Sequence, residues 1–164
     1  MRKTIAVYVE NKYGVLARIS GLFMRRGFNI DSLTVGETED PDFSRVTVTM
    51  DADDNILNQV VNQLNKLYNV KKVKVLERGS STERELLLLK LANTADKRSD
   101  IMAACEIYNA KIIDYSRRTI SIEVTGDSDK IQSFVELMIP NGIIEMCRTG
   151  VVALERGDKI LAEN

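Results

Sequence analysis

The chain has 164 residues, of which 44% are hydrophobic, so it can form one ordinary domain or two small ones. Its 23 lysine and arginine residues nearly balance 24 aspartate and glutamate residues, and the net charge of -1 gives no general attraction to nucleic acid or to anionic lipid. No apolar run is long enough to cross a bilayer, and the alternating N-terminus is unlike a signal peptide, so we expect a cytoplasmic protein with no membrane partner.

Several kinds of catalytic and metal site are made improbable by what the sequence lacks. It contains no histidine, which is the commonest general base at neutral pH and the commonest metal ligand. Cys105 and Cys147 are far apart and form no CxxC pair, so we expect two buried free thiols and no metal site. The glycine-rich loops that bind nucleotide phosphates are also missing. We therefore expect no catalytic residue in this chain and no enzyme activity of its own.

The first half predicts the order βαββαβ, because the period of its apolar residues switches between two and 3.6. The predicted elements are a strand over 5–9, a helix over 15–26, strands over 30–35 and 46–50, a helix over 56–67 and a strand over 70–76. Turn-forming residues at 39–42 separate the second and third strands, and the aspartates at 51–54 can cap the second helix.

The second half repeats this order after a short run of small and polar residues. We expect a strand over 86–91, a helix capped near Ser99 or Asp100, strands over 112–115 and 120–124, a helix over 131–138 and a long last strand over 143–154. The predicted domains are 1–77 and 85–164, joined by a linker over 78–84.

This repeated order is typical of two tandem ferredoxin-like domains of the α+β class. Each would have an antiparallel four-stranded sheet with two helices on one face, which leaves the other face bare. The leucines at 86–89 and the group Val73, Val75 and Leu76 supply apolar side chains to both faces of the strands. We therefore expect a homodimer, in which sheet edges pair or helices stack so that a second copy of the chain covers these faces.

The turn between the first strand and the first helix is the strongest candidate for a ligand site. Gly14 permits a close approach of the backbone, and the start of a helix offers unpaired N–H groups and the positive end of its dipole to a carboxylate. On the residues alone, a simple connection between strand and helix is the more common explanation for such a glycine.

The segment VENKYGVLARISGLFMRRGFNIDSLTVGETEDPDFSRVTV resembles the N-terminal ACT domain of the acetolactate synthase small subunits, also called acetohydroxyacid synthase regulatory subunits. The resemblance continues through ERELLLLK, KIIDYS and CRTGVVALERGDKI, so it covers nearly the whole chain. It implies a non-catalytic subunit that stimulates a catalytic large subunit and confers feedback inhibition by a branched-chain amino acid, usually valine. Thiamine diphosphate, magnesium and FAD would then belong to that catalytic partner, and no cofactor to this chain.

The resemblance also implies a ligand site that two ACT domains of a dimer share. One chain would supply the strand-to-helix turn and the other the start of the second strand, and the residues concerned are Asn11, Gly14, Val15, Leu16, Asn29 and Ile30. Without the resemblance, a role as a turn or helix-cap residue is the better explanation for Asn11, and a role at the end of a helix is the better explanation for Asn29.

Two other classes of function fit the predicted fold. One is a free-standing amino-acid-binding regulator of another enzyme or of transcription, although neither a helix-turn-helix pattern nor a basic surface is visible. The other is a small ferredoxin-like enzyme of the acylphosphatase kind, but the loop after the first strand lacks the arginine that would bind a phosphate.

Overall fold

The computed structural model describes residues 1–162, which divide into two compact units. The first unit comprises Met1–Thr82 together with residues 151–162, and the second comprises Glu83–Gly150. The chain therefore passes from one unit to the other twice. This division differs from the expected domains, because residues 151–162 lie in the first unit instead of completing the second.

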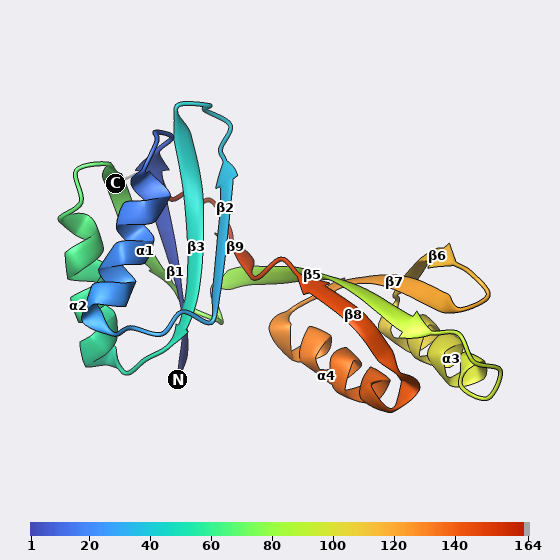
Figure 1. Ribbon diagram of the computed structural model, residues 1–164. Helices are drawn as coiled ribbons and strands as arrows, with labels where there is room; N and C mark the ends of the chain where they lie inside the picture. The colour runs from blue at the N-terminus through green and yellow to red at the C-terminus, as the bar shows by residue number, and fades with distance from the viewer. Residues whose placement is uncertain (163–164) are drawn as a thin grey trace. The chain divides into compact units, whose positions relative to one another are not determined.

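The first unit is a four-stranded antiparallel sheet with two helices on one face (Figure 1). Its elements are β1 (Arg2–Glu10), α1 (Val15–Arg26), β2 (Ser32–Glu37), β3 (Phe43–Asp51), α2 (Asp54–Asn65) and β4 (Val70–Leu76), followed much later by β9 (Val152–Glu155). The strand order is β2-β3-β1-β4, so β1 and β3 are central and β2 lies at an edge of this sheet. The predicted βαββαβ order is confirmed.

The core of the first unit lies between the sheet and the helices, as strand alternation and helical spacing dictate. Ile5 of β1 pairs with Val48 of β3 and with Val75 of β4, and these side chains meet Ile19 and Phe23 of α1 in one apolar cluster. The neighbouring Val73 packs against the same cluster. Both β4 valines therefore face the helices, whereas Leu76 belongs to a second cluster on the opposite face, so this group supplies both faces as expected.

The second unit repeats the arrangement with its own core. Its elements are β5 (Ser81–Ala92), which starts in the first unit, α3 (Arg98–Tyr108), β6 (Lys111–Tyr115), β7 (Thr119–Gly126), α4 (Ser128–Met138), a short 3₁₀ helix (Ile139–Asn141) and β8 (Ile143–Arg148). The strand order β6-β7-β5-β8 is the same as in the first unit. Leu87, Leu89 and Leu91 of β5 pack against α3 and α4, with Phe134 of α4 fully buried among them. Two tandem ferredoxin-like domains are confirmed.

Helix starts show where local chemistry determines the structure. Asp53 precedes α2 and its carboxylate accepts a hydrogen bond from the backbone N–H of Ile56 at 2.8 Å, as predicted for the aspartate cluster. For α3 the prediction was wrong, because the helix begins after Lys97 without a side-chain cap, and Ser99 and Asp100 lie inside it. β2 also begins two residues later than expected, at Ser32.

The C-terminal part of the chain differs most from the expected structure. The single long strand predicted over 143–154 is two strands, because the chain breaks at residues 149–151, where Gly150 has a φ of 84°. Only glycine adopts this left-handed conformation without strain, so the pairing of β8 ends there. β9 then pairs with β5, and the backbone N–H of Arg156 donates to the Ser80 carbonyl at 2.8 Å. The linker expected over 78–84 is shorter in the structure, since β5 already begins at Ser81.

Residues 151–162, the C-terminal segment, cover part of the sheet face opposite the helices of the first unit. Val151, Ala153 and Leu161 form a buried apolar cluster with Ala6 of β1 and Leu76 of β4.

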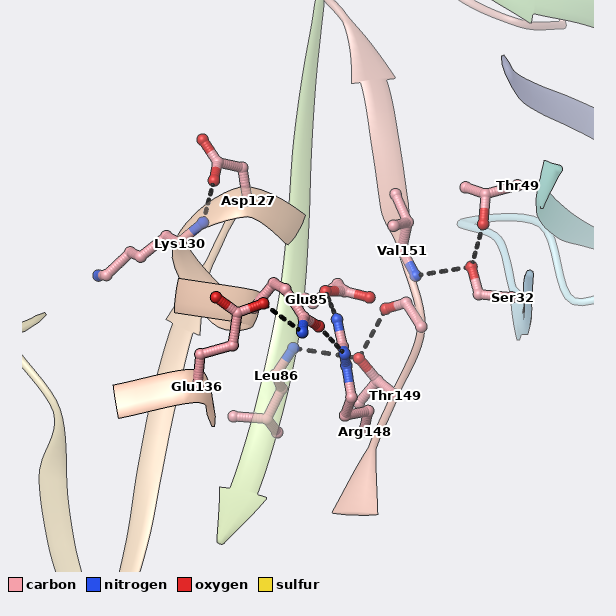
Figure 2. A network of polar contacts seen from close by, with 12 residues as sticks. Ser32, Thr49, Glu85, Leu86, Asp127, Lys130, Glu136, Arg148, Thr149 and Val151 are labelled. Carbon is pink, nitrogen blue, oxygen red and sulfur yellow. Dashed lines mark hydrogen bonds and ion pairs between the residues drawn. The ribbon is translucent and has the colours of Figure 1, made fainter. Parts of the chain in front are cut away.

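Polar contacts attach the same segment to the strands of the first unit. Arg45 of β3 donates from Nη2 to the Ala153 carbonyl at 2.6 Å, and Lys74 forms an ion pair with Glu155. Figure 2 shows the Ser32 hydroxyl between Thr49 and the backbone N–H of Val151, which donates to it at 3.3 Å. The chain itself thus supplies cover that we expected from a second copy.

A buried ion pair lies at the start of the second unit. The Glu85 side chain is only 3% exposed, and Arg148 of β8 donates to it from Nη2 at 2.8 Å (Figure 2). Thr149 accepts a hydrogen bond from the backbone N–H of Leu86 at 3.1 Å next to this pair. The two strands are therefore joined by side chains as well as by their backbone ladder.

The two cysteines differ in their surroundings. Cys105 is buried in the core of the second unit, as expected, and burial raises the pKa of its thiol. Cys147 lies on β8 and is exposed, so the expectation of a second buried thiol was wrong.

Candidate ligand-binding site

The turn from β1 into α1 leaves the start of the helix without a cap. Gly14 is the residue before the helix and has a φ of 80°, a left-handed conformation that favours glycine. It supplies no side chain to the first N–H groups, and the first turn of α1 contains no acidic residue. The first N–H groups of a helix have no acceptor within the helix, and here they lie at the positive end of its dipole, which suits a carboxylate.

Asn11 attaches this turn to the neighbouring loop between β2 and β3. Its backbone N–H donates to the Asp42 carbonyl at 2.7 Å. Its side-chain nitrogen donates to the Pro41 carbonyl at 3.0 Å and to a carboxylate oxygen of Glu37 at 3.2 Å. Both donors of this amide are thus used within the chain, and the amide oxygen is the group that Asn11 can offer to a ligand.

Glu10 and Asn69 hold the other side of the turn. The Glu10 carboxylate pairs with Lys71 at 2.6 Å and with Lys12 at 3.0 Å, and it accepts a hydrogen bond from the Asn69 amide at 2.8 Å. Lys71, Lys12 and Asn69, in that order, lower the pKa of the Glu10 carboxyl to about 2. The oxygen of the Asn69 amide accepts from Arg18 in α1 at 2.8 Å. The contacts of Asn69 and Lys71 do not follow from sequence spacing, since both residues are far from the turn in the chain.

The apolar residues of the turn have different exposures. Val15 is 6% exposed and belongs to the helix-side core, so its side chain stabilises the fold rather than lining an open site. Leu16 is 44% exposed and can contact an apolar group that lies at the helix start. Leu16, and not Val15, therefore supplies the apolar surface that a ligand can reach.

Asn29 and Ile30 lie at the opposite end of α1, between Gly27 and the start of β2. Asn29 is exposed, and Ile30 packs partly against the core. Because α1 has 12 residues at about 1.5 Å each, the helix separates these residues from Gly14 by roughly 18 Å. One protomer therefore brings Asn11, Gly14, Val15 and Leu16 together but not Asn29 and Ile30.

Other kinds of site find little support in the part of the chain that the structure describes. Residues 1–162 contain no group of histidine, cysteine, aspartate or glutamate side chains that could hold a metal ion. Within the same residues, no helix is long and apolar enough to span a membrane. A hollow of about 270 Å³ in the first unit lies between Tyr8, Arg45 and the C-terminal segment, and none of the six expected ligand residues lines it.

Both halves of the chain match family models. Residues 5–72 match the model described as the AHAS small subunit-like ACT domain, and residues 84–157 match that of the small subunit of acetolactate synthase. A probable acetolactate synthase small subunit from Archaeoglobus fulgidus is 52% identical over 97% of this chain and 99% of its own length. The chain belongs to the acetolactate synthase small-subunit family.

Other members of the family support the same assignment. The acetolactate synthase small subunit from Mycolicibacterium smegmatis is 44% identical over 95% of this chain and 92% of its own length. The crystal structure of the small subunit from Thermotoga maritima matches with a TM-score of 0.89 and 38% identity, and the match covers 97% of this chain and 99% of that one. The tandem fold is thus shared with a solved acetolactate synthase small subunit.

Proposed function

We propose that this chain is the non-catalytic regulatory subunit of an acetolactate synthase. It binds a catalytic large subunit, raises its activity and makes it sensitive to inhibition by a branched-chain amino acid, most simply L-valine. Thiamine diphosphate, magnesium and FAD would be bound by the large subunit. One observation carries the proposal: similarity to small subunits extends over 97% of the chain, including both the ACT domain and the second unit.

The proposed amino acid site is completed by a second copy of the chain. β2 is an edge strand of the first unit, so its free edge can pair with the β2 of a partner. If two β2 strands pair antiparallel about a twofold axis, the partner's sheet is reversed in direction. The Gly14 end of one chain then comes next to the Asn29 end of the other, which removes the separation of roughly 18 Å found along α1 within one protomer.

Each part of an aliphatic amino acid has a partner in this arrangement. Its carboxylate lies at the uncapped start of α1, where backbone N–H groups after Gly14 and the helix dipole favour negative charge. Its side chain contacts Leu16 of one chain and Ile30 of the other. Its ammonium group meets the Asn11 amide oxygen and the amide of Asn29.

These contacts support weak and reversible binding. Burial of a branched aliphatic side chain contributes roughly 1.5 to 3 kcal/mol, and each hydrogen bond to a charged group adds about 1.5 to 3 kcal/mol. Ordering of the ligand and the loops subtracts several kcal/mol. The result is a dissociation constant on the order of micromolar to millimolar, which suits a response to a metabolite pool.

Reconstitution tests this function directly. The chain is added to its cognate catalytic subunit, and acetolactate formation is measured over a range of L-valine concentrations, with L-leucine and L-isoleucine in parallel. We expect stimulation without amino acid and inhibition with valine. If the chain neither stimulates nor confers inhibition, the proposed function is wrong.

A pair of variants at Gly14 tests the position of the carboxylate. A Cβ at Gly14 meets no atom within 4 Å, and both asparagine and aspartate tolerate the left-handed conformation better than other side chains. Gly14→Asp adds a charge about 4 Å from the ligand carboxylate, which costs about 1 to 4 kcal/mol, whereas Gly14→Asn adds the same volume without charge. We expect valine sensitivity to fall about fivefold or more further in the aspartate variant than in the asparagine variant. Equal sensitivity of the two variants would place the carboxylate elsewhere.

A further inference from the structure

The Asn69 amide joins the two ends of the turn that precedes α1. Its nitrogen donates to the Glu10 carboxylate at 2.8 Å on the β1 side, and its oxygen accepts from Arg18 Nη1 at 2.8 Å on the helix side. The backbone of Asn69 also takes part, because its carbonyl accepts from the Glu10 N–H at 2.9 Å. Residues 11–14 and the first helical N–H groups therefore lie between two points that one side chain connects.

The charges of its partners determine the orientation of this amide. A carboxylate only accepts hydrogen bonds and a guanidinium only donates them, so the amide nitrogen must face Glu10 and the oxygen must face Arg18. Asn69 itself is only 8% exposed, so its amide is largely shielded from water, whereas Arg18 is exposed. Hydrogen bonds to charged partners are stronger than neutral ones, which makes this connection stiff.

The start of the turn is also held by Asn11 and by the contacts of Lys12 with Glu10, so it is the helix end that has few other bonds. Gly14 provides no cap, and the bond from the Val15 N–H to the Lys12 carbonyl is long at 3.4 Å. Arg18 is also placed against its electrostatic preference, because a cation near the start of a helix is disfavoured by the dipole. Arg18 is thus kept at an unfavourable position by its bond to the buried Asn69 amide, which indicates that this bond has a role in holding the turn.

We propose that Asn69 is a positioning residue for the amino acid site. By connecting Glu10 to Arg18 it fixes the N–H groups that follow Gly14 in the arrangement that a ligand carboxylate requires. It does not touch the ligand. This inference rests on the proposed function for the identity of the ligand, but the bracing of the turn can be measured without any ligand.

A matched control exists in the second unit. Asn93 is also 8% exposed, its amide nitrogen donates to the Ser116 carbonyl at 2.6 Å, and its amide oxygen accepts from Arg98 Nε at 2.9 Å. Asn93→Ala thus removes a similar buried amide with a similar arginine partner, but far along the chain from the turn. It reports the effect of losing such an amide on stability alone.

The experiment compares full-length wild type, Asn69→Ala, Asn93→Ala, Arg18→Ala and the double variant Asn69→Ala/Arg18→Ala. L-valine binding is measured by calorimetry, and hydrogen exchange is measured for the amides of residues 11–18 without ligand. For Asn69→Ala and Arg18→Ala we expect binding to weaken by about tenfold, in the range that residues of such networks contribute. The double variant should be no weaker than the single ones, because both changes remove the same connection. Arg18 is exposed, so its variant keeps the test intact if Asn69→Ala does not fold.

Each outcome decides a separate point. Faster exchange at 11–18 and weaker valine binding in Asn69→Ala, with neither change in Asn93→Ala, supports the inference. Unchanged exchange, unchanged binding or an equal effect of Asn93→Ala overturns it. A third outcome is that the wild type binds no valine, leucine or isoleucine while Asn69→Ala still speeds exchange at the turn. In that case Asn69 does hold the turn, and the proposed function as an amino-acid-binding subunit is the part that fails.

Discussion

Truncating Leu161 to alanine tests whether the C-terminal segment stabilises the first unit. Leu161 is 7% exposed and packs in the buried cluster with Leu76, Val151 and Ala153, on the sheet face away from the helices. If this contact contributes to folding, its loss should be measurable in the strands beneath it, although these strands lie far from Leu161 in the sequence.

The expected magnitude follows from burial. Leucine-to-alanine substitutions in protein cores cost roughly 2 to 5 kcal/mol, and the cost is lower where neighbouring groups can close the cavity. The cluster is small and lies near the chain end, so we expect about 2 kcal/mol, which is about a thirtyfold change in the unfolding equilibrium. The adjacent Ile160 is 50% exposed, and its truncation to alanine should cost less than about 1 kcal/mol.

Hydrogen exchange with mass spectrometry resolves the two units, which a single unfolding curve would average. Protection of amides in β1 and β4 should fall about thirtyfold in Leu161→Ala and only slightly in Ile160→Ala, while β7 of the second unit should keep its protection in both. Equal effects of the two substitutions, or a loss confined to β7, would refute the assignment of this segment to the first unit.

Three further predictions concern charged and thiol groups. Glu85→Ala leaves the partly buried charge of Arg148 without its carboxylate partner, with only the Gln132 amide oxygen still bonded to it. It should lower the stability of the second unit by about 2 kcal/mol, more than Glu85→Gln, in the same exchange measurement; equal losses would contradict this. The Glu10 carboxyl has its pKa lowered from 4.5 to about 2, so its contribution to stability is complete above pH 4.5 and is lost as the pH falls toward 2. Glu10→Gln should therefore flatten the acid side of the curve of stability against pH, and a curve parallel to that of the wild type would be inconsistent with the network. Iodoacetamide should modify Cys147 well before Cys105, because Cys105 is 6% exposed and its thiol pKa is raised by burial; intact mass would reveal simultaneous labelling if the prediction fails.

Local signals predicted most of the fold. α1 begins at Val15 and ends at Arg26 as the apolar spacing indicates, because Gly14 and Gly27 adopt left-handed conformations at its two ends. β4 has the predicted bounds 70–76 for a similar reason, since turn residues precede it and its apolar residues alternate. In these segments the same residues determine both the local conformation and the buried face.

Tertiary choices were not predictable from the same patterns. Alternation over 143–154 is typical of one strand, and nothing local says that the chain breaks at Gly150 or that β9 returns to the first unit. Likewise, alternation cannot tell which side of a strand will be covered, so Cys147 was expected to be buried and is exposed. Such features depend on packing between segments that are distant in sequence.

In the candidate site, too, the local feature was predictable and the contacts between distant residues were not. The sequence points to the turn at Gly14 because the conformation of a glycine before a helix is a local property. It does not reveal that Pro41 and Glu37 use the donors of Asn11, or that Asn69 connects Glu10 to Arg18. Those bonds join residues from different elements, so only the folded chain brings them together.

The two crossings of the chain between the units make the second unit an insertion within the first. Residues 83–150 leave after Thr82 and return at Val151, and the strands beside these crossings are bonded to each other, with the Thr149 N–H donating to the Leu86 carbonyl at 3.1 Å. The residues that cover the sheet of the first unit therefore follow the whole second unit in the chain. A simple truncation after the first domain would remove that cover and expose Ala6 and Leu76.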